Sequence, residues 1–506
     1  MKEFTIFDSA IKFIKLSVFN TEWHDKVYLV GGCVRDKIMG LPIKDIDLMI
    51  DCMDGGIKFA NWMVENFPNV CKNLVLYPRF GTSKFTININ GDENVDIECV
   101  MPRSEKYKEN SRKPIEIKYC SLVDDALRRD FTVNALYMNI TNNEIIDPLK
   151  CGLDDIKNKV LNTTSGPIDI FVEDPLRMLR AIRFECCKGF VMSDRVKDAI
   201  EYCSRYLSNI SIERINDEFS KIICSDFAAE GILFLCDSGL MNYIIPEVND
   251  LYGFNQYSKY HDTDALFHTL RVVKKTKPIL SHRLAALLHD IAKPLYHQDF
   301  YENGKIVKRQ FIGHDVYSAD MAKQILFKLK YSNDIINTVC FAIKNHMILK
   351  QHVDEQGNLK IKDSTCRKIY RTIFDYQDIT LDLINADNMS HSPKYCLSRQ
   401  IEQFIYHCRD LGLTGKISLP ITGDDVMKEF YLSPGPAIKT ILDFAWKLYD
   451  SHPNADKEKL LQQCLHFCDL LIAYFLIGCC LFFDKLSACL DLIFSKLFAG
   501  CDLILI

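Results

Sequence analysis

The chain has 506 residues, which is too long for a single compact core and predicts three or four domains. Its 48% hydrophobic and 25% charged residues, with only 22 Gly and 16 Pro, exclude a disordered, collagen-like or low-complexity protein. The formal net charge of −5 provides no overall attraction for nucleic acid, so any polyanion would have to bind at a local basic surface.

The N-terminal segment and the cysteines favour a cytoplasmic protein. Residues 1–16 mix Lys2, Glu3, Asp8 and Lys12 with apolar residues, so they lack the apolar core of a secretory signal. The 21 cysteines are scattered along the chain and show no paired finger spacing. We therefore expect reduced thiols in a cytoplasmic protein.

A glycine turn follows the first strand that the sequence predicts, at residues 27–30. Gly31 and Gly32 come directly after it and indicate a tight turn. Because glycine has no Cβ, the backbone amides of such a turn can approach a phosphate closely. A helix-compatible stretch, residues 33–40, comes next.

Acidic and apolar residues alternate over residues 43–50, which predicts a second strand. With a period of two, Asp45 and Asp47 lie on one face and the apolar residues point to the core. Two carboxylates held close together repel each other unless a divalent cation lies between them, and hard oxygen ligands suit Mg²⁺. A solvated acidic strand face is the alternative for this pair taken alone.

A third carboxylate would complete a site for two metal ions. The next alternating strand, residues 94–100, supplies Asp96 and, two residues later, Glu98. We predict that Asp96 is the third ligand. Glu98 lies on the same face, and the sequence does not decide between the two.

Two arginines and an acid, Arg128, Arg129 and Asp130, lie beside an apolar segment. They could form a surface ion-pair network. Next to a metal-carboxylate site, however, they are better interpreted as contacts to a triphosphate and a ribose, with Asp130 accepting from a sugar hydroxyl.

Residues 172–185 form a fourth cluster, which has the acids and the proline typical of a helix N-terminus. Asp174 and Arg177 are three residues apart, which predicts that they share a helix face continued by Arg180. A carboxylate accepts from the exocyclic amine of cytosine or adenine, and a guanidinium donates to the ring nitrogen beside it. Such a pair would accept C and A but reject U and G.

In this order the motifs GG-x-VRD, D-x-D, RRDFT-x-NA and EDPLR-x-LRA resemble those of the class II nucleotidyltransferases of the polymerase-beta superfamily. The resemblance is to the bacterial-type CCA-adding tRNA nucleotidyltransferases and their poly(A) polymerase relatives, and it is dense over residues 27–218. It implies addition or repair of the 3′-terminal CCA of tRNA from CTP and ATP, with release of pyrophosphate.

The resemblance also implies residue roles. Asp45 and Asp47 would bind the catalytic Mg²⁺, and Glu173 would hold the arginine of an Asp174/Arg177 template for the base. The implied nucleotide-binding residues are Gly31, Gly32, Arg35, Arg129, Asp130, Asn134, Glu173, Asp174, Arg177 and Arg180. The implied RNA-binding residues, in the loop 103–118, are Arg103, Lys106, Arg112 and Lys113.

Beyond about residue 245 long helical stretches carry a second set of metal-compatible residues: His268, His289, Asp290 and Asp387. Each histidine alone would more often be a packing residue, but an adjacent His-Asp pair on an apolar helix is costly to bury without a cation. The order resembles the HD metal-dependent phosphohydrolases. His314 and His346 stand where members with two metal ions have extra ligands, so one or two ions, of a transition metal or Mg²⁺, are expected.

We therefore predict an α+β fold with five regions: a mixed α/β head at 1–150, a helical neck and body at 151–250, an all-helical HD domain at 251–400, a helical segment at 401–462 and a Cys-rich tail at 463–506. The apolar run 470–483 is shorter than the roughly 18 residues that span a bilayer, so no transmembrane span is expected.

Three alternatives stay open. The HD half could be only a scaffold, with its histidines as packing residues. The same fold could add only A, only CC, or poly(A) tails. Or the N-terminal half could be an inactive RNA-binding module, with the HD domain as the only enzyme. The sequence does not predict the oligomeric state.

Overall fold

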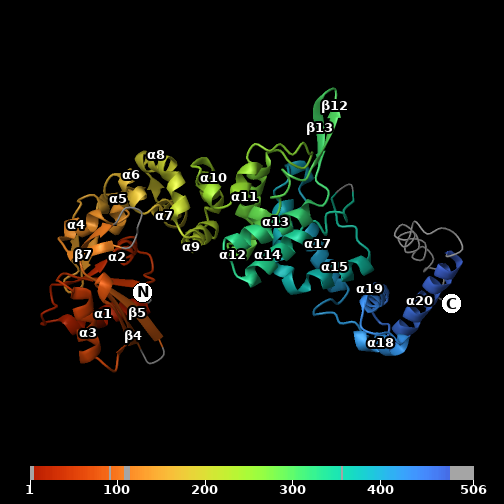
Figure 1. Ribbon diagram of the computed structural model, residues 1–506, viewed down its shortest axis with the longest axis horizontal. Helices are drawn as coiled ribbons and strands as arrows, with labels where there is room; N and C mark the ends of the chain where they lie inside the picture. The colour runs from red at the N-terminus through yellow and green to blue at the C-terminus, as the bar shows by residue number, and fades with distance from the viewer. Residues whose placement is uncertain (1–4, 90–92, 108–113, 355–356, 479–506) are drawn as a thin grey trace. The chain divides into compact units, whose positions relative to one another are not determined.

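The computed structural model describes residues 5–89, 93–107, 114–354 and 357–478 (Figure 1). Contacts between Cα atoms separate two compact units. The first contains Met1–His346 with Ile379–Cys396, and the second contains Met347–Asp378 with Leu397–Ile506. The fold class is α+β, as predicted, with the large sheet in the N-terminal region and mainly helices after it.

A seven-stranded mixed sheet forms the core of the N-terminal region, in the order β3-β4-β5-β2-β1-β8-β9. Only the pair β2 and β5 is parallel among its described neighbours. The strands are β1 (Val27–Val30), β2 (Ile46–Ile50), β3 (Cys71–Tyr77), β4 (Thr82–Ile89), β5 (Glu93–Val100), β8 (Tyr137–Asn139) and β9 (Ile145–Ile146).

Helices accompany this sheet: α1 (Ile6–Val18), α2 (Gly32–Ile38), α3 (Gly55–Asn66), α4 (Leu122–Leu127) and α5 (Gly152–Asn158). Two glycines explain how closely α3 begins against the sheet. A Cβ on Gly55 would lie 2.5 Å from the Ile50 carbonyl oxygen, and one on Gly56 would lie 2.7 Å from the Cys99 carbonyl oxygen. The ends of β2 and β5 are thereby fixed beside each other.

The loop predicted to contact RNA forms a separate hairpin of β6 (Arg103–Tyr107) and β7 (Pro114–Tyr119). The Arg103 guanidinium donates to the Phe80 carbonyl at 3.0 Å. Lys106 lies in β6, whereas Arg112 and Lys113 lie outside the described residues.

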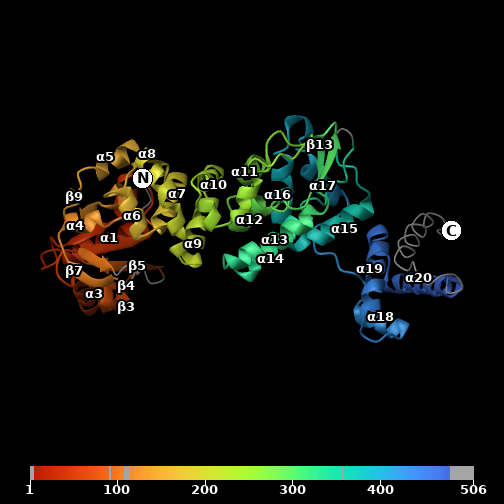
Figure 2. The same ribbon diagram turned by 45° about the horizontal axis from the view of Figure 1, so that its top comes forward.

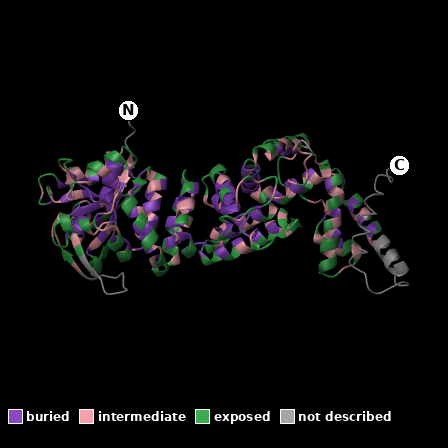
Figure 3. Cartoon of the chain, turned by 90° about the horizontal axis from the view of Figure 1, so that it is seen from above, coloured by how far each residue is buried: buried purple, intermediate pink, exposed green. Residues whose placement is uncertain are grey.

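Short helices continue the first unit: α6 (Pro167–Glu173), α7 (Leu176–Lys188), α8 (Asp194–Cys203), α9 (Ile212–Ile223) and α10 (Ala228–Asp237), with a small sheet of β10 (Val160–Leu161) and β11 (Val191–Met192). Figure 3 shows buried residues concentrated inside the head and along these helices. In α7 the buried side chains include Leu176, Leu179 and Ile182, whereas Arg177 and Arg180 contact the head.

The remaining helices of the first unit are α11 (Ala265–Lys275), α12 (Leu280–Leu288), α13 (His314–Lys328), α14 (Asn333–Asn345) and α16 (Gln377–Asn388). They gather in one group (Figure 2). A hairpin of β12 (Gln298–Glu302) and β13 (Lys305–Gln310) projects from this group (Figure 1).

The second unit is built from α15 (Asp363–Ile373), α17 (Gln400–Asp410), α18 (Gly423–Phe430), α19 (Pro436–Ser451) and α20 (Lys457–Gly478). Residues 347–378, which the sequence places in an HD domain at 251–400, cluster here. Arg371 on α15 pairs with the buried Asp450 on α19 at 2.8 Å. Among the described helices, none has the length and apolar character to cross a membrane, and the predicted tail lies outside the described residues beyond 478.

Candidate active sites

Three carboxylates converge where β2 lies beside β5. Asp45 immediately precedes β2, Asp47 lies within it, and the parallel register pairs Asp47 with Glu98. Burial, together with the charges of Asp45 and Glu98, raises the pKa of Asp47 to about 6, against the effect of Arg129. The three acidic side chains gathered at this point of the sheet are what a cation site requires.

Asp96, the predicted third ligand, is engaged elsewhere. Its carboxylate pairs with Lys84 Nζ at 2.8 Å and accepts from the Thr86 hydroxyl at 2.9 Å. These contacts lower the pKa of Asp96, whereas Glu98 adds its charge to that around Asp47. The structure therefore favours Glu98 over Asp96, because register, which the sequence alone did not fix, sets Glu98 directly opposite Asp47.

Gly31 forms the turn between β1 and α2 with a φ of 71°, a conformation that favours glycine. A Cβ at this position would lie 3.5 Å from Arg129 Nη1. Arg129 therefore lies beside the glycine turn, and its positive charge also lowers the pKa of Asp47. The predicted phosphate-side residues Gly31 and Arg129 lie together.

Asp125, which the sequence analysis did not single out, holds the two arginines. Its Oδ2 accepts from Arg129 Nη2 at 2.9 Å, and its Oδ1 accepts from Arg128 Nη2 at 2.6 Å. Burial alone would raise the pKa of Asp125, but Arg129, Arg128 and the Tyr137 hydroxyl lower it to about 2. Its position one helical turn before Arg129 was the sequence signal that could have identified Asp125 as a partner of the arginines.

Arg35 is buried and does not face the carboxylates. Its Nε donates to Asp36 at 2.8 Å, its Nη1 donates to Asn134 Oδ1 at 2.5 Å, and its guanidinium lies 4.8 Å from the centre of the Phe184 ring. Asp36 in turn accepts from Lys188 at the end of α7. These contacts join α2 to α7, and the triphosphate contact predicted for Arg35 stays a prediction.

Asp130 and Asn134 belong to the same network. Asp130 accepts from the Asn134 amide at 2.9 Å and from Arg180 Nη2 at 2.6 Å. Burial raises the pKa of Asp130, but Arg180 and Asn134 bring it below its usual value. One oxygen of Asp130 accepts from the Phe131 backbone N–H, and the other accepts from Arg180 on α7. These hydrogen bonds attach α7 to the head.

The prediction that Asp174 and Arg177 share one helix face is wrong. Asp174 is the C-cap residue of α6 and has an extended backbone. The next helix, α7, begins after Pro175, so Asp174 lies outside the helix that carries Arg177. Pro175 disfavours a helical conformation of the residue before it, which explains the break. Arg177 Nη1 pairs with Glu173 at 2.8 Å, and Asp174 accepts from Arg214 at 3.0 Å.

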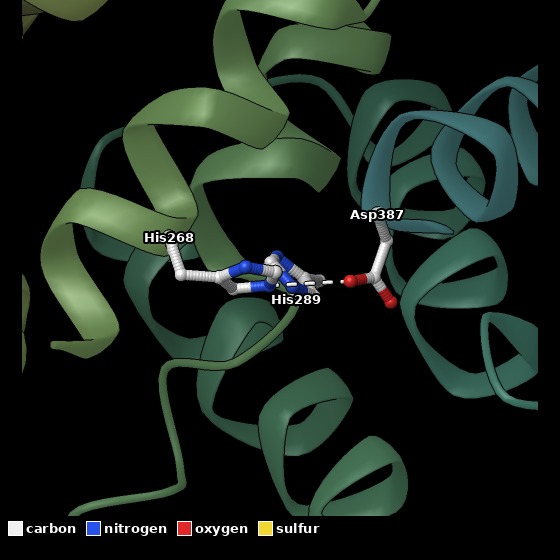
Figure 4. Close-up of side chains that lie close together, drawn as sticks. All are labelled: His268, His289 and Asp387. Atoms are coloured by element: carbon white, nitrogen blue, oxygen red, sulfur yellow. Dashed lines mark ion pairs between the residues drawn. The ribbon is translucent and has the colours of Figure 1, made fainter. Parts of the chain in front are cut away.

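A second cluster, termed here the His/Asp centre, forms where helix ends meet. The ligand atoms of His268, His289 and Asp387 lie within 4.8 Å of one another (Figure 4). Those of a second triad lie within the same distance of one another. Figure 4 shows His268 on its helix facing Asp387, with 3.2 Å between Nε2 and Oδ1. The second triad consists of Asp290, His314 and His346.

The six side chains of the His/Asp centre are all buried. Burial lowers the pKa of His268 to about 4, so this ring is neutral and able to bind a metal at neutral pH. Asp290 stays charged because His289 and Lys293 keep its pKa low against the effect of burial. The Nε2 atom of His346 is buried without a hydrogen-bond partner, which is costly unless something else binds it.

This donor set fits metal ions. Imidazoles together with carboxylates are typical ligands of transition metals, and the two triads supply donors for one or two ions. Lys293, which the sequence analysis did not assign, pairs with Asp290 at 2.6 Å and donates to Gln256 at 2.8 Å. His391 Nε2 lies 3.5 Å from Asp387.

Three protein-family models match successive regions of the chain. The model of the poly A polymerase head domain matches residues 27–162, that of a probable RNA- and SrmB-binding site of polymerase A matches residues 189–251, and that of the HD domain matches residues 266–378.

Similar curated proteins extend over most of the chain. The tRNA nucleotidyltransferase cca2 of Schizosaccharomyces pombe is 26% identical over 454 residues, covering 86% of this chain and 90% of that protein. The CCA-adding enzyme of Lactiplantibacillus plantarum is 26% identical over 420 residues, covering 82% and 86%.

Solved structures show the same fold. The Bacillus stearothermophilus CCA-adding enzyme in complex with CTP aligns with a TM-score of 0.61 at 21% identity, over 94% of this chain and 100% of that one. The Thermotoga maritima enzyme complexed with tRNA aligns with a TM-score of 0.53 at 19% identity, over 88% and 91%. The chain therefore carries, in order, matches to a poly A polymerase head domain, an RNA-binding region of polymerase A and an HD domain, and it is similar over most of its length to CCA-adding tRNA nucleotidyltransferases.

Proposed function

We propose that the chain adds or repairs the 3′-terminal CCA of tRNA, using CTP and ATP and releasing pyrophosphate. The observation that carries this proposal is the convergence of Asp45, Asp47 and Glu98 beside the glycine turn at Gly31. Carboxylates next to bare backbone amides suit a metal-bound triphosphate. We place this activity in the cytoplasm, in keeping with the free cysteines among the described residues.

Asp45, Asp47 and Glu98 would hold the magnesium ions. Bound there, Mg²⁺ would lower the pKa of the attacking tRNA 3′-hydroxyl and stabilise the charge of the triphosphate. Arg129 adds positive charge at the glycine turn, and Asp125 fixes its direction through two hydrogen bonds. The buried Asp125 carboxylate accepts hydrogen bonds from both neighbouring arginines and so orders them.

The base would be recognised by Asp174 and Arg177. Arg177 is held from two sides, by Glu173 and by the Arg128 carbonyl, which receives Nη2 at 3.0 Å. Asp174 is fixed by Arg214. This pair offers one acceptor and one donor, the set that matches the Watson–Crick edges of C and A but meets the carbonyl groups of U and G.

We propose further that Arg35, Asp130, Asn134 and Arg180 act by positioning the base-reading helix α7 against the head, since their described contacts lie within that network. The glycine turn would be completed by Gly32. Arg103, with Lys106, Arg112 and Lys113, would contact tRNA.

The His/Asp centre would hydrolyse phosphate esters. His268, His289 and Asp387 would hold one metal ion, and Asp290, His314 and His346 a second. Bound there, a transition metal or Mg²⁺ would supply a hydroxide nucleophile at neutral pH. We assign the head to 1–150, the neck and body to 151–250, the HD domain to 251–400, the helical segment to 401–462 and the tail to 463–506.

The test is incorporation of single labelled nucleotides into tRNA that lacks its CCA end. We expect two C additions followed by one A, with no incorporation of U or G. Unlimited addition of A would favour a poly(A) polymerase, and addition of A alone to tRNA ending in CC would favour the A-adding activity named for a relative from Deinococcus radiodurans that is 29% identical. No incorporation at all would leave the HD domain as the only enzyme.

A further inference from the structure

We propose that an exposed surface of aromatic and basic side chains binds single-stranded RNA beside the His/Asp centre. The members of this aromatic–basic surface are Lys259, Tyr260, Lys394 and Tyr395. The proposal rests on the proposed function only in taking RNA as the substrate of the chain. It names a site that neither the motifs nor the nucleotidyl transfer reaction uses.

Two segments that are far apart in the sequence build this surface. The Ser392 backbone N–H donates to the Tyr260 carbonyl at 2.8 Å, and the Ser392 hydroxyl donates to the Lys259 carbonyl at 3.1 Å. These bonds hold the loop before α11 against the segment after α16. The surface is therefore part of the folded unit.

The side chains of the surface have the arrangement that stacks bases and binds phosphates. Lys259 Nζ lies 5.2 Å from the ring centroids of both Tyr260 and Tyr395, whose rings meet edge to face at 5.3 Å. Lys394 Nζ lies 5.7 Å from the Tyr395 ring. Because Tyr260 is 44% exposed, its ring can stack on a base, while the ammonium groups beside it neutralise phosphates.

Charge in this region favours a polyanion. The nearest acid of the loop, Asp262, is paired with Arg271 at 2.6 Å, so it does not offset the two lysines. A second arginine fixes the loop from the β12–β13 hairpin: Arg309 Nη1 donates to the Asn255 carbonyl at 2.6 Å. A fixed basic loop loses little conformational entropy when a strand binds.

The surface leads directly to the His/Asp centre. The Tyr260 ring lies 5.9 Å from that of His391, whose Nε2 is 3.5 Å from Asp387 Oδ1. The next residue, His261, turns inward: its ring is 4.4 Å from that of His268, and its buried Nδ1 has no hydrogen-bond partner. A nucleotide stacked on Tyr260 would thus place its phosphate next to a candidate metal ligand, with His261 available to donate or accept a hydrogen bond.

Photocrosslinking with the full-length protein tests the proposal. A single-stranded hexaribonucleotide containing 4-thiouridine is irradiated with the protein, and the adducts are mapped by mass spectrometry. We expect an adduct within residues 252–264 or 391–396. Replacing both tyrosines (Tyr260→Ala with Tyr395→Ala) should lower its yield about tenfold, the effect of losing one or two stacked bases.

Charge reversal gives a second variant that does not disturb packing. Lys259→Glu with Lys394→Glu changes only exposed side chains and should lower the same adduct about tenfold by repelling phosphate. Tyr301→Ala, on the β12–β13 hairpin, removes a ring that is more exposed than that of Tyr260 and does not belong to the aromatic–basic surface, so it should leave the yield unchanged.

Adducts confined to residues 1–250, or an equal loss with Tyr301→Ala, would overturn the proposal. All three variants should still incorporate nucleotides into truncated tRNA at the parental rate. If the parent protein incorporates none while the adduct near Tyr260 forms, the proposed nucleotidyl transfer fails and the RNA surface stands.

Discussion

The carboxylate site of the head and the His/Asp centre place metal-binding side chains in opposite environments. Asp45 and Glu98 are exposed and Asp47 is half-buried on a sheet, whereas all six side chains of the His/Asp centre are buried between helix ends. An open carboxylate site can receive metal together with a nucleotide triphosphate. In a closed centre a buried unpartnered nitrogen is costly, so we expect a bound metal to stabilise the folded structure there.

The largest effect is expected at the head. Asp47→Asn keeps the shape of the side chain but removes the charge that binds metal, so incorporation into truncated tRNA should fall about a thousandfold or more. Single-turnover incorporation with CTP measures it. The matched control, His289→Gln in the His/Asp centre, should change that rate less than about twofold. Equal losses in both variants would show that the two sites do not act separately.

Two substitutions test whether Glu98 or Asp96 is the third metal ligand of the head. Glu98→Gln should lower the incorporation rate about a hundredfold, because it removes a charge opposite Asp47. Asp96→Asn removes only an exposed ion pair with Lys84 and should cost less than about twofold. The reverse order of effects would restore Asp96 as the third ligand.

These two residues show how far the sequence alone could go. The alternating pattern predicted both strands and placed Asp96 and Glu98 on one face, but it could not give the register between β2 and β5, which are separated by some forty residues of chain. Register depends on how α3 packs at Gly55 and Gly56, a tertiary contact without a local sequence signal.

The prediction that Asp174 and Arg177 share one helix face was wrong for a related reason. The spacing of Asp174 and Arg177 fitted one helix, yet Pro175 divides that stretch between α6 and α7. In the His/Asp centre, by contrast, the predicted residues come together, because each stands at or near a helix end whose position follows from hydrophobic periodicity. Lys293 and His391 escaped notice since single basic residues carry no motif.

The pH dependence of the head follows from the raised pKa of Asp47. Below about pH 6 the Asp47 carboxyl binds a proton, which a metal ion must displace. At subsaturating Mg²⁺ the incorporation rate should fall about tenfold per pH unit below 6 and be flat above it. Excess Mg²⁺ should move the break to lower pH, and a profile insensitive to Mg²⁺ would contradict this assignment.

The same carboxyl group, Asp47, should also affect the stability of the metal-free protein, but the pH trend should be opposite to that of the incorporation rate. The folded-state pKa of Asp47, about 6, exceeds its usual value of 3.8, so the folded state binds more protons between these values. Stability without metal should therefore decrease as pH rises through this window. Urea unfolding of the first unit measures the trend, which Asp47→Asn should abolish.

The smallest effect on nucleotide addition, and the clearest contrast, is expected from His346→Ala. Since His346 Nε2 has no hydrogen-bond partner, its removal relieves an uncompensated polar atom, and this offsets part of the cost of the cavity it leaves. The metal-free variant should unfold within a few degrees of the metal-free parent, about the shift of a 1 kcal/mol change. Added Mn²⁺ should raise the unfolding temperature of the parent more than that of the variant, which keeps only the first triad intact, while CTP incorporation stays within about twofold. If Mn²⁺ stabilises both proteins equally, the second triad does not bind metal, and the contrast between an open site and a metal-filled centre fails.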